Sequence, residues 1–288
     1  MTSTTLIRLQ LGGRGPRRRK PRPWSTVIGC VIIAVFVFFA LFGGIVTPYD
    51  PLKITGEPLT PPSAAHWLGT DDIGRDVWSY TVAGSGVYLQ IGLSVAVITL
   101  VLGVLVGTLA GYVGGIVDGI LLKITEFFQV IPGFVLALVV VAILGQNTWY
   151  TIIALSLTMW PATARIVRSQ FLSLKQQEFV EAARSQGFGG TFIAVRDVLP
   201  NALPPAIVQT LLDVGTSILL AAGLAFLGLS DPNRPDWGLM LNRSQQYLEQ
   251  APWMSLGPGL AIFLVVIGIN LLDDLVNNLL SGTIGRRK

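Results

Sequence analysis

The sequence is poor in the residues that most enzymes and secreted domains depend on. It holds one cysteine and one histidine in 288 residues. Cys30 cannot form a disulfide framework by itself, and His66 is too isolated to build a Cys/His metal cluster or a Ser-His-Asp set. There is also no GxxxxGK[ST] phosphate loop, which excludes ATP binding by that route. The chain is therefore not expected to be an enzyme, and we expect no cofactor or metal in it.

Charge is scarce as well. Charged residues make up 12% of the chain, about half of the roughly 25% that is usual in soluble domains. Hydrophobic residues make up 51%, and the mean hydropathy is +0.63. This balance places the chain among membrane proteins before any motif is considered.

The apolar residues gather in six segments, each long enough to count as a candidate bilayer span. The first follows a basic stretch and runs into "TPYDP" without a small-x-small cleavage site, so we expect a retained membrane helix and no cleaved signal peptide. Gly and Ala are frequent in the second, which allows close helix packing. Pro132 and Gly133 break the third. The segments cover residues 27–46, 88–112, 120–144, 150–166, 205–229 and 256–280.

Lysine and arginine are distributed unevenly between the connecting segments. With the N-terminus placed in the cytoplasm, 16 basic residues fall inside and four outside. This bias follows the positive-inside rule and predicts six spans with both termini cytoplasmic. We expect an all-α polytopic membrane protein in a bacterial plasma membrane. The basic N-terminal tail is interpreted as a topology anchor, so no nucleic-acid partner is expected. The expected parts are a basic cytoplasmic tail, a first span, an extracytoplasmic loop, a five-helix core and a cytoplasmic tail, at residues 1–26, 27–46, 47–87, 88–280 and 281–288.

One polar stretch, "EFVEAARSQGFGGTFIAVRDVLPNALPP", interrupts the apolar second half at residues 178–205. Residues 169–186 lack Pro and Gly and carry opposite charges three residues apart, at Lys175–Glu178 and Glu181–Arg184, which favours a helix. Gly187 suits the C-cap, Thr191 could cap a second short helix, and Pro200 could end it. Small side chains at Ala182 and Ala183 would let another protein approach closely. An ordinary connector between spans remains the alternative.

These residues resemble a family. "EAA" at Glu181–Ala183, followed by Gly187 and by Leu199–Pro200, looks like the loop signature of ABC-importer permeases. Further stretches are similar to the "C"-type second permease of the dipeptide, oligopeptide and nickel branch, over roughly residues 24–274. They are "HWLGTDDIGRDVWSY", "GYVGGIVDGIL", "ARIVRSQFLSLKQQEFVEAAR", "LPNALPPAIVQ" and "GLAFLGLSDPNRPDWGLML". The residue Val87 after "GSG" and the absence of an Asp-Pro-Arg tail depart from the pattern.

The resemblance implies a type I ABC importer permease fold, with a cytoplasmic coupling helix between the fourth and fifth spans. It implies that residues 169–200 dock on one or two ATPase subunits that bind ATP and Mg²⁺. The coupling residues would be Glu181, Ala182, Ala183, Gly187 and Phe188. The remaining implied partners are a second permease, forming a heterodimer, and an extracytoplasmic substrate-binding protein. The expected cargo is a di- or oligopeptide, with a nickel chelate or another small solute as the alternative.

The long outer loop gathers several charged residues within "GTDDIGRDVWS". Structural ion pairing and helix capping explain them most simply, because a hard-cation site needs more oxygen ligands and Arg75 competes for the carboxylates. Docking of the binding protein is the functional alternative. The candidate docking residues are Asp71, Asp72, Arg75, Asp76 and Trp237. The tryptophans of the outer loops would otherwise belong to an interfacial aromatic belt.

Asp213 is the one acid well inside a predicted span. A carboxylate at this depth is costly and usually faces a bundle interior or a wet cavity. It is either part of a translocation path or hydrogen-bonded to Thr210, Thr216 or Ser217. The scarcity of such charges also argues against the competing function class, a secondary transporter driven by an ion gradient.

Overall fold

The computed structural model describes residues 23–284, and the regular elements of this part are all helices. Most of the basic N-terminal tail and the last residues of the C-terminal tail lie outside the described residues. The α-helices are α1 Pro23–Val46, α2 Val77–Val113, α3 Gly115–Val130, α4 Gly133–Leu144, α5 Thr148–Leu174, α6 Glu178–Ser185, α7 Gly190–Ile193, α8 Leu199–Phe226, α9 Trp237–Ser244 and α10 Trp253–Ile284. A π-helical stretch, Ala194–Val198, joins α7 to α8, and a 3-10 turn, Gln245–Tyr247, follows α9.

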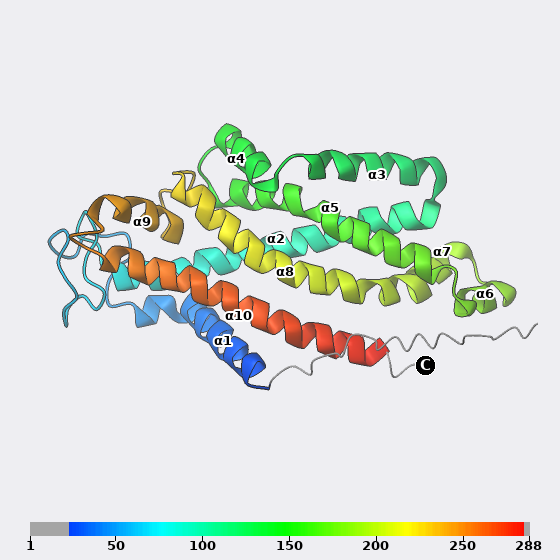
Figure 1. Cartoon of the computed structure of the whole chain (residues 1–288), viewed down its shortest axis with the longest axis horizontal. Coiled ribbons are helices and arrows are strands. Elements are labelled where there is room, and N and C mark those ends of the chain that lie inside the picture. The colour runs from blue at the N-terminus through cyan, green and yellow to red at the C-terminus, as the bar shows by residue number, and fades with distance from the viewer. Residues whose placement is uncertain (1–22, 285–288) are drawn as a thin grey trace, which may run out of the picture.

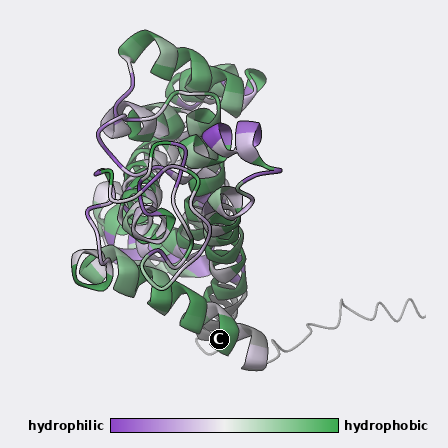
Figure 2. Ribbon diagram, turned by 90° about the vertical axis from the view of Figure 1, so that its left-hand side faces the viewer, coloured by the Kyte–Doolittle hydropathy of each residue, from purple (hydrophilic) through white to green (hydrophobic). Residues whose placement is uncertain are grey.

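The long helices run along one common direction (Figure 1). The loop 47–76 and α9 lie at one end of the bundle, and α6 and α7 lie at the other. Figure 2 shows mainly hydrophobic helices, with hydrophilic colour in the loops at the end that faces the viewer. The distribution fits a bundle whose sides face lipid and whose two ends face water.

Four helical stretches are long and apolar enough to cross a membrane: 26–46, 77–113, 190–226 and 253–273. A fifth results if α3 and α4 count as one span, although the chain bends by 85° between them. The break predicted at Pro132 and Gly133 is therefore confirmed. Helix α5 carries Arg165 and Arg168 and is not among these candidate spans, so the structure supports four or five of the six.

Helix α2 begins eleven residues before the predicted second segment. Asp76 stands at its N-cap and accepts a hydrogen bond from the Ser79 amide at 2.7 Å. The outer loop predicted over 47–87 is therefore irregular only as far as Asp76. The apolar count missed this first part of the helix because Ser79, Thr81 and Gly84 dilute it.

Glycines bring α2 against α5, as their frequency in this segment predicted. A Cβ on Gly103 would lie 2.6 Å from Thr163, and one on Gly107 would lie 2.5 Å from the Ala164 carbonyl oxygen. One on Gly111 would lie 2.7 Å from the Cβ of Phe171. Such distances leave no room for a side chain, so the two helices touch through their backbones. The buried core beside this contact joins α2, α4, α5, α8 and α10.

Candidate functional site

The segment singled out by the sequence forms two short helices, α6 and α7, at the end of the bundle opposite the loop 47–76 (Figure 1). The helix predicted over 169–186 is interrupted. Helix α5 continues to Leu174, three residues turn, and α6 starts at Glu178. The turn allows Val180 of α6, 1% exposed, to pack with Phe171 of α5 and Ile193 of α7. Burial of these apolar side chains outweighs continuation of the helix, since nothing else would cover them.

Gly187 ends α6 in the way its position predicted. Its φ is +86°, a left-handed conformation that favours glycine. The Gly187 amide donates to the Arg184 carbonyl at 2.9 Å, and the Phe188 amide donates to the Ala183 carbonyl at 3.2 Å. This pair of bonds is a Schellman motif, which satisfies the last carbonyl groups of the helix and fixes the turn that follows it.

The second part of the segment differs from the prediction. The N-cap of α7 is Gly189, and the Thr191 hydroxyl lies 2.9 Å from the Tyr112 hydroxyl instead of capping a helix. Pro200 ends nothing, because it occupies the first turn of α8 and the chain stays helical from α7 through the π stretch. Proline is tolerated in the first turn of an α-helix.

The charged pairs expected three residues apart also rearrange. Neither Lys175–Glu178 nor Glu181–Arg184 is among the ion pairs of residues 23–284. The Lys175 ammonium instead donates to the Gly111 carbonyl at 3.1 Å, which ties the turn after α5 to the end of α2.

The five predicted coupling residues lie close together on this hairpin. Glu181, Ala182, Gly187 and Phe188 are exposed, and Ala183 is half-buried. A hollow of about 440 Å³ lies beside them. Its lining is mixed in character and consists of Phe179, Ala182, Ala183, Gln186, Phe188, Phe192, Arg196 and Asp197.

One wall of this hollow is an aromatic and cationic stack. The rings of Phe188 and Phe192 stack with centroids 5.1 Å apart, and the Arg196 guanidinium lies 5.2 Å from the Phe192 ring centroid. This stack was not predicted from the sequence. Phenylalanines on both sides of the turn, with Arg196 four residues after Phe192, were the signal that could have shown it.

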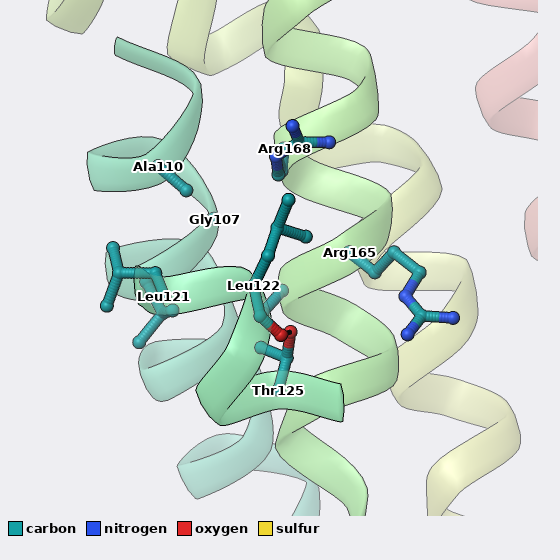
Figure 3. Close-up of a pocket in the computed structure, with 9 residues that line it drawn as sticks. Gly107, Ala110, Leu121, Leu122, Thr125, Arg165 and Arg168 are labelled. Carbon is teal, nitrogen blue, oxygen red and sulfur yellow. Dashed lines mark hydrogen bonds between the residues drawn. The ribbon is translucent and has the colours of Figure 1, made fainter. Parts of the chain in front are cut away.

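A second charged contact of this half of the bundle was also missed. Arg168 of α5 donates to Asp118 of α3, with Nη2 2.6 Å from Oδ2. Figure 3 shows the adjoining pocket, with Gly107 and Ala110 on one side and Thr125 on α3. Its volume is about 10 Å³, room for about one water, so we do not consider it a ligand site. The signal in the sequence that could have indicated this ion pair was the presence of opposite charges in or beside apolar segments.

The outer loop is built around its charged residues. Asp71, 0% exposed, accepts from the Arg75 Nε at 2.6 Å, and Arg75 lies over the Tyr80 ring. Asp76 caps α2 and lies 2.9 Å from the His66 Nδ1. The interpretation as ion pairing and capping is confirmed. His66, which seemed isolated in the sequence, is part of this cluster.

The Trp237 indole is the largest fully buried side chain. It donates to the Thr81 carbonyl at 2.8 Å. An interfacial aromatic belt is therefore wrong for Trp237. Only Asp72 among the five candidate docking residues is more than slightly exposed, while Asp71, Arg75, Asp76 and Trp237 are buried. In this conformation these four residues lie beneath the surface of the loop region and support it from inside.

Asp236 precedes Trp237 and caps α9. Its Oδ1 accepts from the Tyr88 hydroxyl at 2.7 Å and from the Gly238 amide at 2.9 Å. Burial raises the pKa of the Asp236 carboxyl to about 6, although the hydrogen bonds from Tyr88 and from the backbone oppose the shift. The buried Asp236 carboxylate accepts hydrogen bonds both from the first turn of α9 and from Tyr88 of α2, and it thereby joins the two helices.

Asp213 lies in α8 and is 5% exposed. Its Oδ1 accepts from the Gln209 Nε2 at 2.9 Å, and its Oδ2 is buried with no hydrogen-bond partner among the described residues. The expected partners Thr210, Thr216 and Ser217 all donate to backbone carbonyls instead. The prediction that one of these three hydroxyls donates to Asp213 is therefore wrong.

Several known proteins resemble this chain over most of its length. The family model described as "Binding-protein-dependent transport system inner membrane component" matches residues 103–285. A dipeptide transport system permease of Alkalihalophilus pseudofirmus is 39% identical over 250 residues, covering 86% of this chain and 82% of the relative. A glutathione transport system permease of Shigella flexneri is 39% identical over 260 residues, covering 89% and 86%. A di/tripeptide transport system permease of Pseudomonas aeruginosa is 38% identical over 254 residues, covering 85% and 84%.

A solved structure shows the same fold. The structure titled "Inward facing conformations of the MetNI methionine ABC transporter" superposes with a TM-score of 0.56 at 21% identity, covering 70% of this chain and 96% of that one. Sequence and fold agree with the resemblance carried by the EAA loop. The chain therefore belongs to the family of binding-protein-dependent transport system inner membrane components.

Proposed function

We propose that this chain is the membrane-spanning permease subunit of an ATP-driven importer for short peptides. The relatives named for dipeptide, di/tripeptide and glutathione transport cover most of its length and support a peptide cargo. The chain itself provides the gated path, and ATP with Mg²⁺ is bound and hydrolysed by separate ATPase subunits.

The proposed assembly pairs this chain with a second permease in a bacterial plasma membrane. Six spans, with α5 included and α3–α4 counted once, would place both termini in the cytoplasm, in agreement with the distribution of Lys and Arg. The loop 47–76 and α9 would then face outward, and α6 and α7 would face the ATPases.

The observation that carries the proposal is the construction of the α6–α7 hairpin. Its outer surface is exposed at Ala182 and Gly187, whereas its inner surface is held by Val180 and Ile193 in a buried cluster with the end of α5. A docking surface fixed to two long helices transmits movement to both of them. A loosely attached loop would absorb the movement instead.

ATP binding would draw two ATPase subunits together, and each would grip one such hairpin. The tilt of α5 and α8 that follows would open the cavity between the two permeases toward the outside. The ATPases need only bind the outward-open state more tightly than the inward-open state for the equilibrium to shift.

Two glycines of the hairpin give a matched test. Gly187 has φ +86°, Gly189 has φ −67°, and a Cβ at either would meet no atom within 4 Å. Valine at Gly187 therefore strains the turn by about 1–2 kcal/mol, whereas valine at Gly189 meets no such backbone strain. We expect the Gly187→Val complex to assemble and hydrolyse ATP with greatly reduced peptide import. The Gly189→Val complex should import normally.

The measurement is uptake of a labelled dipeptide and ATP hydrolysis by the reconstituted complex in the same vesicles. Normal import by the Gly187→Val complex would remove the coupling assignment. Loss of import in both variants would indicate that the hairpin tolerates no bulk, which would leave the role of the turn unsupported.

The binding protein would land on the outer loop and α9. Because Asp71, Arg75, Asp76 and Trp237 are buried, we propose that they hold this landing surface in shape while Asp72 and its exposed neighbours make contact. Trp67 and Ile73 are such neighbours, at 56% and 42% exposure. We also propose that Asp213 borders the translocation path once α5 and α8 separate.

A further inference from the structure

The C-terminal end of α2 contacts both arms of the α6–α7 hairpin. The Tyr112 hydroxyl lies 2.9 Å from the Thr191 hydroxyl of α7, and the Lys175 ammonium, in the turn before α6, donates to the Gly111 carbonyl at 3.1 Å. Helix α2 is not joined to either arm through the backbone, because the chain continues from it into α3. These side-chain contacts therefore connect the hairpin to a helix that is not part of it.

The same end of α2 packs on the side chain that anchors the hairpin. The Tyr112 ring meets the Phe171 ring edge-on at a centroid distance of 6.5 Å, and a Cβ on Gly111 would lie 2.7 Å from the Cβ of Phe171. Phe171 is buried in one cluster with Val180 and Ile193 of the hairpin. Apolar packing thus holds α2 and the hairpin in a fixed relation.

The Lys175 contact suits the end of a helix. The last carbonyl groups of a helix have no donor within it, and they carry the negative end of the helix dipole. Gly111 lies in the last turn of α2, three residues before the C-cap Gly114. The Lys175 ammonium satisfies one of these carbonyls, so the turn before α6 is bound directly to the backbone of α2.

The contact between the two hydroxyls adds a polar link to α7. A Cβ on Gly190 would lie 3.3 Å from the Tyr112 hydroxyl oxygen, so α7 approaches this group closely. Tyr112 and Thr191 are both exposed. Water competes for exposed hydroxyls, so their bond contributes little to folding. Its clearer effect is to fix the position of α7 relative to α2.

At the opposite end of the bundle the same helix holds α9 (Figure 1). The Tyr88 hydroxyl of α2 donates to Asp236 at 2.7 Å, and the Gly238 amide donates to the Tyr88 hydroxyl at 3.2 Å. The Trp237 indole of α9 donates to the Thr81 carbonyl of α2. Helix α2 therefore contacts α7 near one end and α9 near the other.

No proline interrupts α2 between these contacts. Tyr88 and Tyr112 are separated by about 36 Å of continuous helix, at 1.5 Å per residue. The two helices that continue into the hairpin do contain internal prolines, Pro161 in α5 and Pro204 and Pro205 in α8. Proline removes a backbone hydrogen bond and kinks a helix. Movement of the hairpin is thus transmitted along α2 without the bends that α5 and α8 allow.

From these features we infer that α2 couples the α6–α7 hairpin to α9, with Tyr112 and Lys175 as the positioning residues at the hairpin end. The inference rests on the proposed function, which places the ATPases at the hairpin and the binding protein at α9 and the loop 47–76. Nucleotide bound to the ATPases then changes the affinity of the transporter for its binding protein. By thermodynamic linkage, the binding protein changes the affinity for nucleotide by the same factor.

The affinity of the binding protein tests this coupling. The complete transporter is placed in nanodiscs, and its fluorescently labelled binding protein is titrated without nucleotide and with a non-hydrolysable ATP analogue. The ratio of the two dissociation constants, taken within each purified complex, measures the coupling. We expect a wild-type ratio of about 5- to 150-fold, the usual range for two coupled sites.

Two substitutions remove the hydroxyl contact from opposite sides. Tyr112→Phe keeps the ring against Phe171, and Thr191→Val keeps the shape of threonine. Each should reduce the wild-type ratio by about two- to tenfold, the range that one hydrogen bond supplies. Lys175→Met removes the other contact at similar side-chain length and should act in the same direction. Thr191→Ser is the matched control, because it retains the hydroxyl and should retain the wild-type ratio.

The double variant Tyr112→Phe/Thr191→Val distinguishes one shared contact from two separate effects. If the two residues act through their mutual bond, the double variant should give the same ratio as either single variant. Reductions that multiply in the double variant would overturn the assignment to this contact.

Three further results would overturn the inference. They are an unchanged ratio in Tyr112→Phe, an equal loss in Thr191→Ser and Thr191→Val, and a wild-type ratio of one. Import of a labelled dipeptide is measured on the same complexes. A wild-type complex that imports the dipeptide with a ratio of one would contradict the coupling through α2 and would leave the proposed function supported.

Discussion

The Trp237 indole lies parallel to the Tyr88 phenol ring, with centroids 4.5 Å apart and planes within 7°. The two residues are far apart in sequence, and their contact fixes α9 to α2. Gly84 makes this possible, since a Cβ there would lie 2.3 Å from the Trp237 Nε1. The end of the bundle that carries the loop 47–76 is thus held by a buried aromatic pair.

Removal of the Trp237 indole should destabilise the protein strongly. We expect Trp237→Ala to lower the free energy of unfolding by about 3–5 kcal/mol, the usual cost of truncating a buried tryptophan. Denaturant titration of the purified chain in mild detergent measures it. Trp67→Ala is the control, because Trp67 is 56% exposed and should cost well below 1 kcal/mol. Equal effects of the two substitutions would contradict the role of the stack.

The Asp236 carboxyl should make stability depend on pH. Its folded pKa of about 6 lies above an unfolded value of about 3.9, so the folded chain binds the proton more tightly. The resulting stabilisation is present below about pH 4 and is lost as the pH rises through 6. Relative to the Asp236→Asn variant, the wild type should therefore lose about 1 kcal/mol of its free energy of unfolding between pH 5 and pH 7.

The control for this pH dependence is Asp50, which is exposed in the loop 47–76. The backbone hydrogen bond from Leu52 lowers the pKa of Asp50, so that residue completes its titration at lower pH. Asp50→Asn should show no change between pH 5 and pH 7. A pH-independent difference for Asp236→Asn would contradict the effect of burial on its carboxyl.

The contact between α2 and α5 should not tolerate a side chain. Gly107→Val would place a Cβ 2.5 Å from the Ala164 carbonyl oxygen, and we expect a loss of about 2 kcal/mol or misassembly of the two helices. Gly119→Val is the matched control on α3, because a Cβ there meets nothing within 4 Å. Thermal unfolding of both variants in detergent decides the matter. A Gly107→Val chain as stable as the control would mean that α2 and α5 lie farther apart.

The proposed path role of Asp213 predicts a transport defect without a folding defect. Asp213→Asn can still accept the Gln209 hydrogen bond, so the complex should assemble and bind ATPase subunits normally. If the charge meets the cargo, peptide import should fall by about tenfold, equivalent to about 1.4 kcal/mol of barrier. Thr216→Val on the exposed side of α8 is the control. Wild-type import by Asp213→Asn would remove the residue from the path.

Much of the architecture could be predicted from the chain itself. Long apolar runs require helices in a bilayer, so the spans, the break at Pro132–Gly133 and the left-handed turn at Gly187 could be foreseen from local chemistry. The helix ends were less accessible. The start of α2 at Val77 and the turn at residues 175–177 depend on a cap and on buried contacts that local composition does not report.

The amino-acid sequence by itself determined that this is a hydrophobic, helical membrane protein with a polar hairpin near the start of α8. Only the tertiary structure decided which polar groups are used internally. For Asp71, Arg75 and Asp76 the sequence left open ion pairing and capping or docking of a partner, and the structure buries them, with Trp237, against partners of their own. Asp118 pairs with Arg168 across fifty residues of sequence. The reason is physical. Hydrophobic burial follows local pattern, whereas the pairing of buried polar groups depends on which helices meet, and that is settled only when the bundle packs.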